Sequence, residues 1–176
     1  MRGRVASLVG PGEVVIKEFD LPDPGPGEVL VKVRRANLCG SELHIVHFRH
    51  PLLRECVLGH EFVGEVAALG AGVATDYAGA PVAVGDRVTA AYFLTCRRCE
   101  SCLAGDFNLC LHAYDYWSRP AEAAPHFHGT FATHYVIHAD QYFYRVPDSV
   151  SDATAAGAPA FSTGPELKYT GTSVRL

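Results

Sequence analysis

Four cysteines within one short stretch constrain the fold of this chain more than any other feature of its sequence. They follow the spacing C-x2-C-x2-C-x7-C and are Cys96, Cys99, Cys102 and Cys110. Four thiolates complete the tetrahedral shell of a structural zinc and leave no position for a substrate. The surrounding segment, 95–130, shows little periodicity, so we expect zinc binding to supply folding energy that a hydrophobic core supplies elsewhere. Two disulfides in a secreted protein are the alternative.

The expected compartment and partners follow from what the rest of the sequence contains. The residues before Gly10-Pro11-Gly12 include too few apolar residues for a signal peptide, which predicts a cytoplasmic protein. In a reducing compartment, clustered cysteines are more often metal ligands than disulfides. Apolar runs are short, well below the ~20 residues of a membrane span. The net charge is -4 without a basic cluster, so we expect neither a membrane nor a nucleic acid as partner.

Alternating apolar residues predict a mainly β fold. Val29, Val31 and Val33 share one face of the segment 28–34, whereas Lys32 and Arg34 occupy the other. Similar patterns predict strands at 5–9, 14–16, 61–69, 82–84, 87–91, 131–137 and 142–146. The polar segment 148–152 followed by alanine-rich 153–158 predicts a helix. Short strands separated by turns are typical of a barrel or a sandwich.

A second group of metal-binding residue types lies upstream of the cysteine cluster. Cys39 follows the strand predicted at 28–34, and His60 comes 21 residues later. One sulfur and one imidazole are a ligand mixture typical of catalytic zinc, where one position stays open for water or substrate. Taken alone, either residue is more often an ordinary buried side chain.

The motifs around these two residues resemble those of the zinc-containing medium-chain alcohol dehydrogenases. Gly59-His60-Glu61, with Gly64, Gly70 and Val73 at the following signature positions, is similar to that family's zinc-binding signature. The segment Cys39-Gly40-Ser41-Glu42-Leu43-His44 resembles its C-G-[ST]-[DE]-x-H motif, and Gly85-Asp86-Arg87-Val88 resembles a recurrent turn. The resemblance implies a GroES-like β-barrel catalytic domain over 1–164, with its zinc-bound four-cysteine lobe at 95–112.

The resemblance also implies a role for each residue of the second group. Cys39 and His60 would bind the catalytic zinc, and Glu61 would coordinate it transiently or hold a water. Ser41 would hydrogen-bond the alcohol or aldehyde oxygen. His44 would pass the proton towards solvent.

Further implied positions concern the surroundings of the catalytic zinc. Glu42 would accept a hydrogen bond from His60 and orient its ring. A third protein ligand usually precedes the cofactor domain, but that position falls on Pro159 or Ala160, and neither binds metal. Glu61 is one substitute, and a histidine of the long loop, such as His126 or His128, is another.

The sequence departs from the family in lacking a nicotinamide-binding motif. No G-x-G-x-x-G turn is present, so we expect no hydride transfer unless a domain supplied elsewhere binds NAD(P). Residues 165–176 are interpreted as a tail or as a strand returning to the barrel. Barrel surface uncovered by the missing domain favours a homo-oligomer.

Three functions are compatible with these observations. The first is zinc-activated chemistry on a small alcohol or aldehyde, as in an oxidoreductase. The second is a stand-alone zinc enzyme that catalyses hydration, elimination or cyclisation without nicotinamide. The third is a non-catalytic, zinc-stabilised binding scaffold. Aromatic and polar residues of the long loop are candidates for a substrate pocket: Tyr114, Tyr116, Trp117, Phe127 and His128.

Overall fold

The computed structural model describes residues 1–161, and it describes side chains through residue 158. The predicted boundary at 164 and the tail or returning strand at 165–176 lie outside the described residues. The strands are β1 (Arg2–Gly10), β2 (Glu13–Asp20), β3 (Val29–Asn37), β4 (Cys56–Val57), β5 (Glu61–Leu69), β6 (Arg87–Ala90), β7 (His134–Ile137) and β8 (Phe143–Arg145). The helices are α1 (Gly40–Val46), α2 (Glu100–Ala104), the 3-10 turn η1 (Phe107–Leu109) and α3 (Asp152–Phe161).

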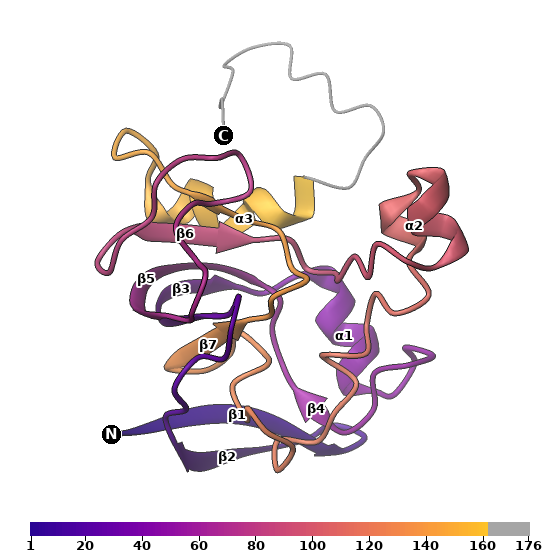
Figure 1. Ribbon diagram of the computed structural model, residues 1–176. Coiled ribbons are helices and arrows are strands. Elements are labelled where there is room, and N and C mark those ends of the chain that lie inside the picture. The colour runs from indigo at the N-terminus through magenta and orange to yellow at the C-terminus, as the bar shows by residue number, and fades with distance from the viewer. Residues whose placement is uncertain (162–176) are drawn as a thin grey trace.

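The strands form two antiparallel sheets (Figure 1). The smaller sheet has the order β2-β1-β4, and the larger has the order β7-β3-β5-β6-β8. A bridge between Val5 and Ala132 links β1 to the segment that precedes β7. α3 packs against β3, β5 and β6, while α2 projects at the right of the molecule in this view (Figure 1). The mainly β fold with short helices is confirmed.

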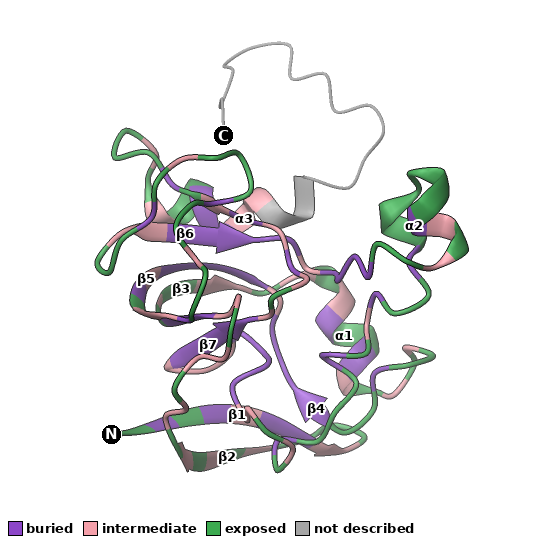
Figure 2. Cartoon of the chain, in the orientation of Figure 1, coloured by how far each residue is buried: buried purple, intermediate pink, exposed green. Residues whose placement is uncertain are grey.

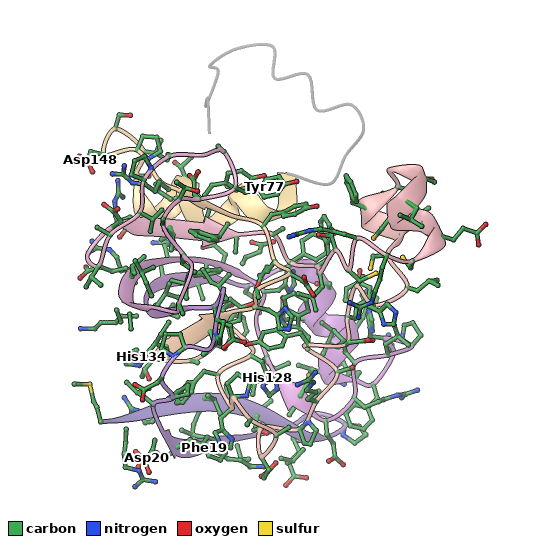
Figure 3. The ribbon with its side chains drawn as sticks, in the orientation of Figure 1. Phe19, Asp20, Tyr77, His128, His134 and Asp148 are labelled. Carbon is green, nitrogen blue, oxygen red and sulfur yellow. The ribbon has the colours of Figure 1, made fainter. Side chains whose placement is uncertain are left out.

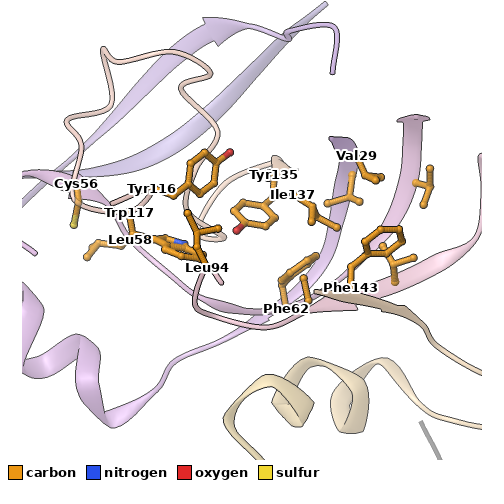
Figure 4. Packing of buried hydrophobic residues seen from close by; sticks show 14 of the residues in the cluster. Val29, Cys56, Leu58, Phe62, Leu94, Tyr116, Trp117, Tyr135, Ile137 and Phe143 are labelled. Carbon is orange, nitrogen blue, oxygen red and sulfur yellow. The ribbon is translucent and has the colours of Figure 1, made fainter. Parts of the chain in front are cut away.

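Alternating burial along the strands produces the core, as predicted. Val29 and Val31 are fully buried on β3, whereas Lys32 and Arg34 are exposed. Whereas α2 is mostly exposed, buried residues are concentrated in strands of both sheets (Figure 2). Aromatic rings from the long loop and from β5, β7 and β8 fill the space between them (Figure 4).

Two sequence-based assignments need correction. No strand forms at 82–84: this segment is a turn in which the Asp86 carboxylate accepts a hydrogen bond from the Ala83 N–H, and Val84 is 65% exposed. The expected strand at 131–137 begins only at His134. The sequence pattern also missed α1 and the short strand β4. The predicted helix at 153–158 is confirmed and extends from Asp152 to Phe161.

The carboxylate of Asp152 holds the start of α3 against the larger sheet. It lies 2.9 Å from Arg34 Nε on β3 and 2.7 Å from an Arg87 guanidinium nitrogen on β6. Hydrogen bonds and charge attraction from these two arginines lower the pKa of Asp152.

Among residues 1–161, none of the helices combines the length and the apolar character that a membrane crossing requires.

Candidate metal centres

The four predicted cysteines meet at one point of the lobe that contains α2 and η1. Their sulfur atoms all lie within 4.8 Å of one another. The Cys96–Cys102 and Cys99–Cys110 sulfur pairs are each 4.0 Å apart. A tetrahedron of sulfurs about 2.3 Å from a zinc ion has edges of about 3.8 Å, so the four thiols fit this metal. A disulfide requires about 2.05 Å, and all four cysteines are free thiols, so the disulfide alternative is wrong.

Backbone N–H groups in the lobe are directed at the sulfur atoms. The Cys99 N–H donates to Cys96 Sγ at 3.3 Å, and the N–H groups of Cys96 and His112 donate to Cys110 Sγ at 3.4 Å. Backbone hydrogen bonds, that from Leu111 first, lower the pKa of the Cys99 thiol to about 6. The thiolate is the form that binds metal, so this polar backbone favours a cation between the sulfurs.

The pairing of β3 with β5 brings Cys39 and His60 together. Asn37 at the end of β3 is directly opposite Glu61 at the start of β5. Cys39 follows the end of β3 by two residues, and His60 immediately precedes β5. Because the two strands are antiparallel, these flanking residues emerge at the same edge of the sheet.

A glycine is required where the chain enters this edge. Gly59 has φ +91°, and a Cβ atom at this position would lie 2.5 Å from the backbone nitrogen of Phe131. The Phe131 N–H donates to the Leu58 carbonyl, and the Thr130 N–H donates to the Gly59 carbonyl. These bonds fix the backbone just before His60.

Glu42 connects the two candidate ligands. Ligand atoms of Cys39, Glu42 and His60 all lie within 4.8 Å of one another. Glu42 Oε1 lies 2.9 Å from His60 Nδ1, and Oε2 accepts a hydrogen bond from the Cys39 N–H at 3.0 Å. The side chain is 2% exposed, and Oε1 has no donor among the described residues other than this ring nitrogen. With Nδ1 facing Glu42, Nε2 is the His60 nitrogen left for a metal.

The charge distribution of this group fits a cation. Burial lowers the pKa of His60, but contacts with Glu42 and Cys39 more than offset this effect, so its pKa is raised. Burial, with a smaller contribution from Glu42, raises the pKa of the neighbouring Cys56 thiol to about 12. A sulfur and an imidazole nitrogen close to a buried carboxylate are a setting that suits zinc, with Cys39 and His60 as the ligands.

A cavity of about 260 Å³ opens beside these residues. Ser41 and Glu61 line it, as the predicted roles require, whereas His44 is exposed and does not. Most of the other lining side chains are apolar or aromatic: Ile45, His50, Leu53, Cys56, Val57, Leu58, Tyr92, Tyr114 and Trp117. His50 and Tyr92 were missed by the sequence analysis, because single residues on loops carry no periodic or motif signal.

The predicted aromatic pocket is only partly correct. Tyr114 and Trp117 line the cavity, but Tyr116, Phe127 and His128 belong to the buried core. The Tyr116 hydroxyl donates to the carbonyl of Val136 at 2.7 Å. These three side chains face the interior, since each residue is at most 1% exposed.

The two long-loop histidines proposed as substitute ligands do not line the cavity. His128 is completely buried, its Nε2 lies 3.0 Å from the Arg119 carbonyl, and burial lowers its pKa to about 4 (Figure 3). His126 stacks on Phe19 with ring centroids 4.2 Å apart. The side chains of Pro159 and Ala160 lie outside the described residues.

Comparison with known proteins shows which family has this arrangement. Residues 25–148 match the family model of the alcohol dehydrogenase GroES-like domain. A sorbitol dehydrogenase of Halalkalibacterium halodurans is 34% identical over 157 residues, which cover 89% of this chain and 42% of the relative. The chain thus spans less than half the length of this relative.

Solved structures show the same fold. An alcohol dehydrogenase from Thermotoga maritima superimposes with a TM-score of 0.82 at 25% identity. The match covers 94% of this chain and 48% of the Thermotoga maritima chain. An acetophenone reductase from Geotrichum candidum, solved with NAD, has a TM-score of 0.68 at 30% identity. This match covers 90% of this chain and 44% of the reductase. The chain therefore belongs to the alcohol dehydrogenase family and forms its GroES-like domain.

Proposed function

We propose that Cys39 and His60 hold a zinc ion and that the adjacent cavity binds a small alcohol or aldehyde for oxidoreduction. The observation that carries this proposal is the meeting of Cys39, Glu42 and His60 beside a largely apolar cavity. The relatives' names, sorbitol dehydrogenase and alcohol dehydrogenase, support the substrate class. When bound, zinc lowers the pKa of a hydroxyl and polarises a carbonyl.

The side chains around the cavity would then divide the work. Glu42 would fix the His60 ring and leave Nε2 free to hold the metal. Ser41, on the cavity wall, hydrogen-bonds the reacting oxygen and accepts its proton. His44 is exposed on the same helix and passes that proton to solvent. Glu61 lies on the cavity wall and holds a water or coordinates transiently.

Hydride transfer is assigned to residues beyond those of this domain. The acetophenone reductase was solved with NAD, and this chain covers 44% of it. We therefore propose that the 176-residue chain alone activates a substrate oxygen but does not reduce NAD(P). Substantial NAD(P)-linked turnover by the purified chain would contradict this part of the proposal.

Metal analysis of three proteins tests the proposed centre directly. The purified chain should contain two zinc ions, one in the lobe and one beside the cavity. Cys39→Ser should contain one, because it removes the sulfur ligand of the cavity site. Cys56→Ser is the matched control: Cys56 lines the same cavity but lies outside the ligand cluster, so two ions should remain. One zinc in all three proteins would favour the binding-scaffold alternative.

The free thiols of the lobe are compatible with the cytoplasmic location that we propose. We also propose a homo-oligomer, which sedimentation of the purified chain would test.

A further inference from the structure

The loop between α1 and β4 places one histidine in the wall of the candidate substrate cavity. His50 lines this cavity together with the proposed ligands Cys39 and His60. Its ring is held by its own loop, because the N–H groups of Leu52 and Leu53 donate to His50 Nδ1 at 3.2 and 3.0 Å. The ring is therefore an ordered part of the wall.

These two bonds determine which ring nitrogen carries the proton. A nitrogen that accepts hydrogen bonds cannot itself be protonated, so the single proton of the neutral ring lies on Nε2. Burial lowers the pKa of His50, which favours the same neutral form. The His50 ring, a part of the cavity wall, thus carries a hydrogen-bond donor at Nε2 and no free acceptor.

The donor has no partner within the described part of the chain. Both hydrogen bonds of the His50 ring involve Nδ1, and the neighbouring Tyr114 meets the ring edge to face, with centroids 5.5 Å apart. Ile45, Leu53 and Trp117 provide apolar surface on the same cavity wall. In a mostly apolar site, a few fixed polar groups determine which ligand binds and in which orientation.

We propose that His50 is a specificity-determining residue whose Nε2–H donates to a second oxygen of the substrate. This inference rests on the proposed function, because the first oxygen is the one activated beside Cys39 and His60. The preferred substrates are accordingly alcohols or carbonyl compounds that carry another acceptor oxygen: an ether, a carbonyl, a hydroxyl or a carboxylate. A simple aliphatic alcohol leaves the donor unpaired.

Two ligands of equal size isolate the contribution of this donor. In 2-methoxyethanol an ether oxygen replaces one methylene of butan-1-ol, so the pair differs by a single acceptor. Dissociation constants of both would be measured on the zinc-loaded full chain by saturation-transfer NMR. The readout is the ratio of the two constants, which cancels any general change in the cavity.

Two variants separate the donor from the loop anchor. His50→Asn places a carbonyl oxygen where Nδ1 lies and can keep the bonds from Leu52 and Leu53, but it has nothing at Nε2. His50→Gln places an amide N–H near the Nε2 position and gives up the anchor. His47→Asn is the control, because His47 is exposed in the same loop and does not line the cavity.

His50→Asn should shift the affinity ratio towards butan-1-ol by about threefold to tenfold, as expected for one neutral hydrogen bond. His50→Gln and His47→Asn should keep the wild-type ratio. An unchanged ratio in His50→Asn would overturn the inference, and so would an equal shift in Asn and Gln variants, which would assign the effect to loop structure. Failure of the proposed function is recognised separately, since the wild-type chain would then lack its second zinc.

Discussion

Glu42 offers the sharpest test of how the candidate catalytic centre is organised. Its two carboxylate oxygens serve two different groups: Oε1 faces His60 Nδ1 at 2.9 Å, and Oε2 accepts the Cys39 N–H at 3.0 Å. Glu42→Gln keeps the shape of the side chain but leaves only one acceptor. Whichever way the amide is oriented, its NH2 group meets a donor at Cys39 or at His60.

The cost follows from that conflict. Losing the partner that orients a ligating histidine typically lowers metal affinity by about 10- to 100-fold, or about 1.4–2.8 kcal/mol. Losing an acceptor for a buried N–H costs the fold about 1–3 kcal/mol. We therefore expect Glu42→Gln to release its cavity zinc at least tenfold more readily, while the lobe zinc is unaffected.

Competition with a chromophoric zinc chelator measures both zinc affinities. Cys39→Ser should lack the cavity zinc, so the phase of the titration that is missing in this variant belongs to the cavity site. Glu28→Gln is the matched control. The Glu28 carboxylate accepts a hydrogen bond from the Gly25 N–H at 2.9 Å, and Glu28 does not line the cavity. Glu28→Gln should lower stability without changing either zinc affinity. A cavity zinc equally tight in Glu42→Gln and the wild type would refute the view that this carboxylate orients His60.

Three further predictions concern the scaffold. Gly59→Ala should lower the free energy of unfolding by about 3 kcal/mol or more, because alanine would have a positive φ and its Cβ would clash with the backbone. Gly72 also has a positive φ but open space around it, so Gly72→Ala should cost about 1 kcal/mol. Urea denaturation would compare the two variants. Asp152→Asn should cost about 1 kcal/mol at pH 7. Because the folded-state pKa of Asp152 is lowered, this difference should be present in full above the ordinary value of 3.8 and be lost as the pH falls through the lower folded-state pKa. Equal losses at pH 7 and pH 2 would contradict the reasoning. Chelation of zinc should abolish hydrogen-exchange protection in the lobe at 95–112 while leaving β3 and β5 protected, and uniform loss across the chain would show that the lobe does not fold as a separate unit.

The parts of the fold that were predictable are those specified by local sequence. The Val29, Val31, Val33 alternation predicts β3 because the side-chain period of a strand is visible within a few residues. The short apolar run at 82–84 misleads, because the Asp86 carboxylate caps a turn there and leaves Val84 exposed. Local pattern reports what a segment can form, and tertiary context decides between a strand and a turn.

The helix α1 was missed for a related reason. It begins after Cys39, which is not among the residues that usually cap a helix, although Glu42 stands at the position from which a carboxylate can cap the N-terminus. His50 and Tyr92 could not be found at all, since their place in the cavity depends on how separate loops meet. The family resemblance implied the candidate ligands Cys39 and His60 but gave no information on the cavity wall.

The two candidate metal centres also differ in how far the local sequence specifies them. The lobe draws its four sulfurs from one continuous segment, so the spacing of the cysteines almost determines the site by itself. The cavity centre draws Cys39 and His60 from two different strands, just past the end of β3 and just before the start of β5, and their meeting depends on the register that places Asn37 against Glu61. A slip of one residue in that register would turn every side chain of β5 to the opposite face of the sheet. The packing of the two strands is therefore what brings the second set of candidate ligands together, whereas the first set lies within one continuous segment.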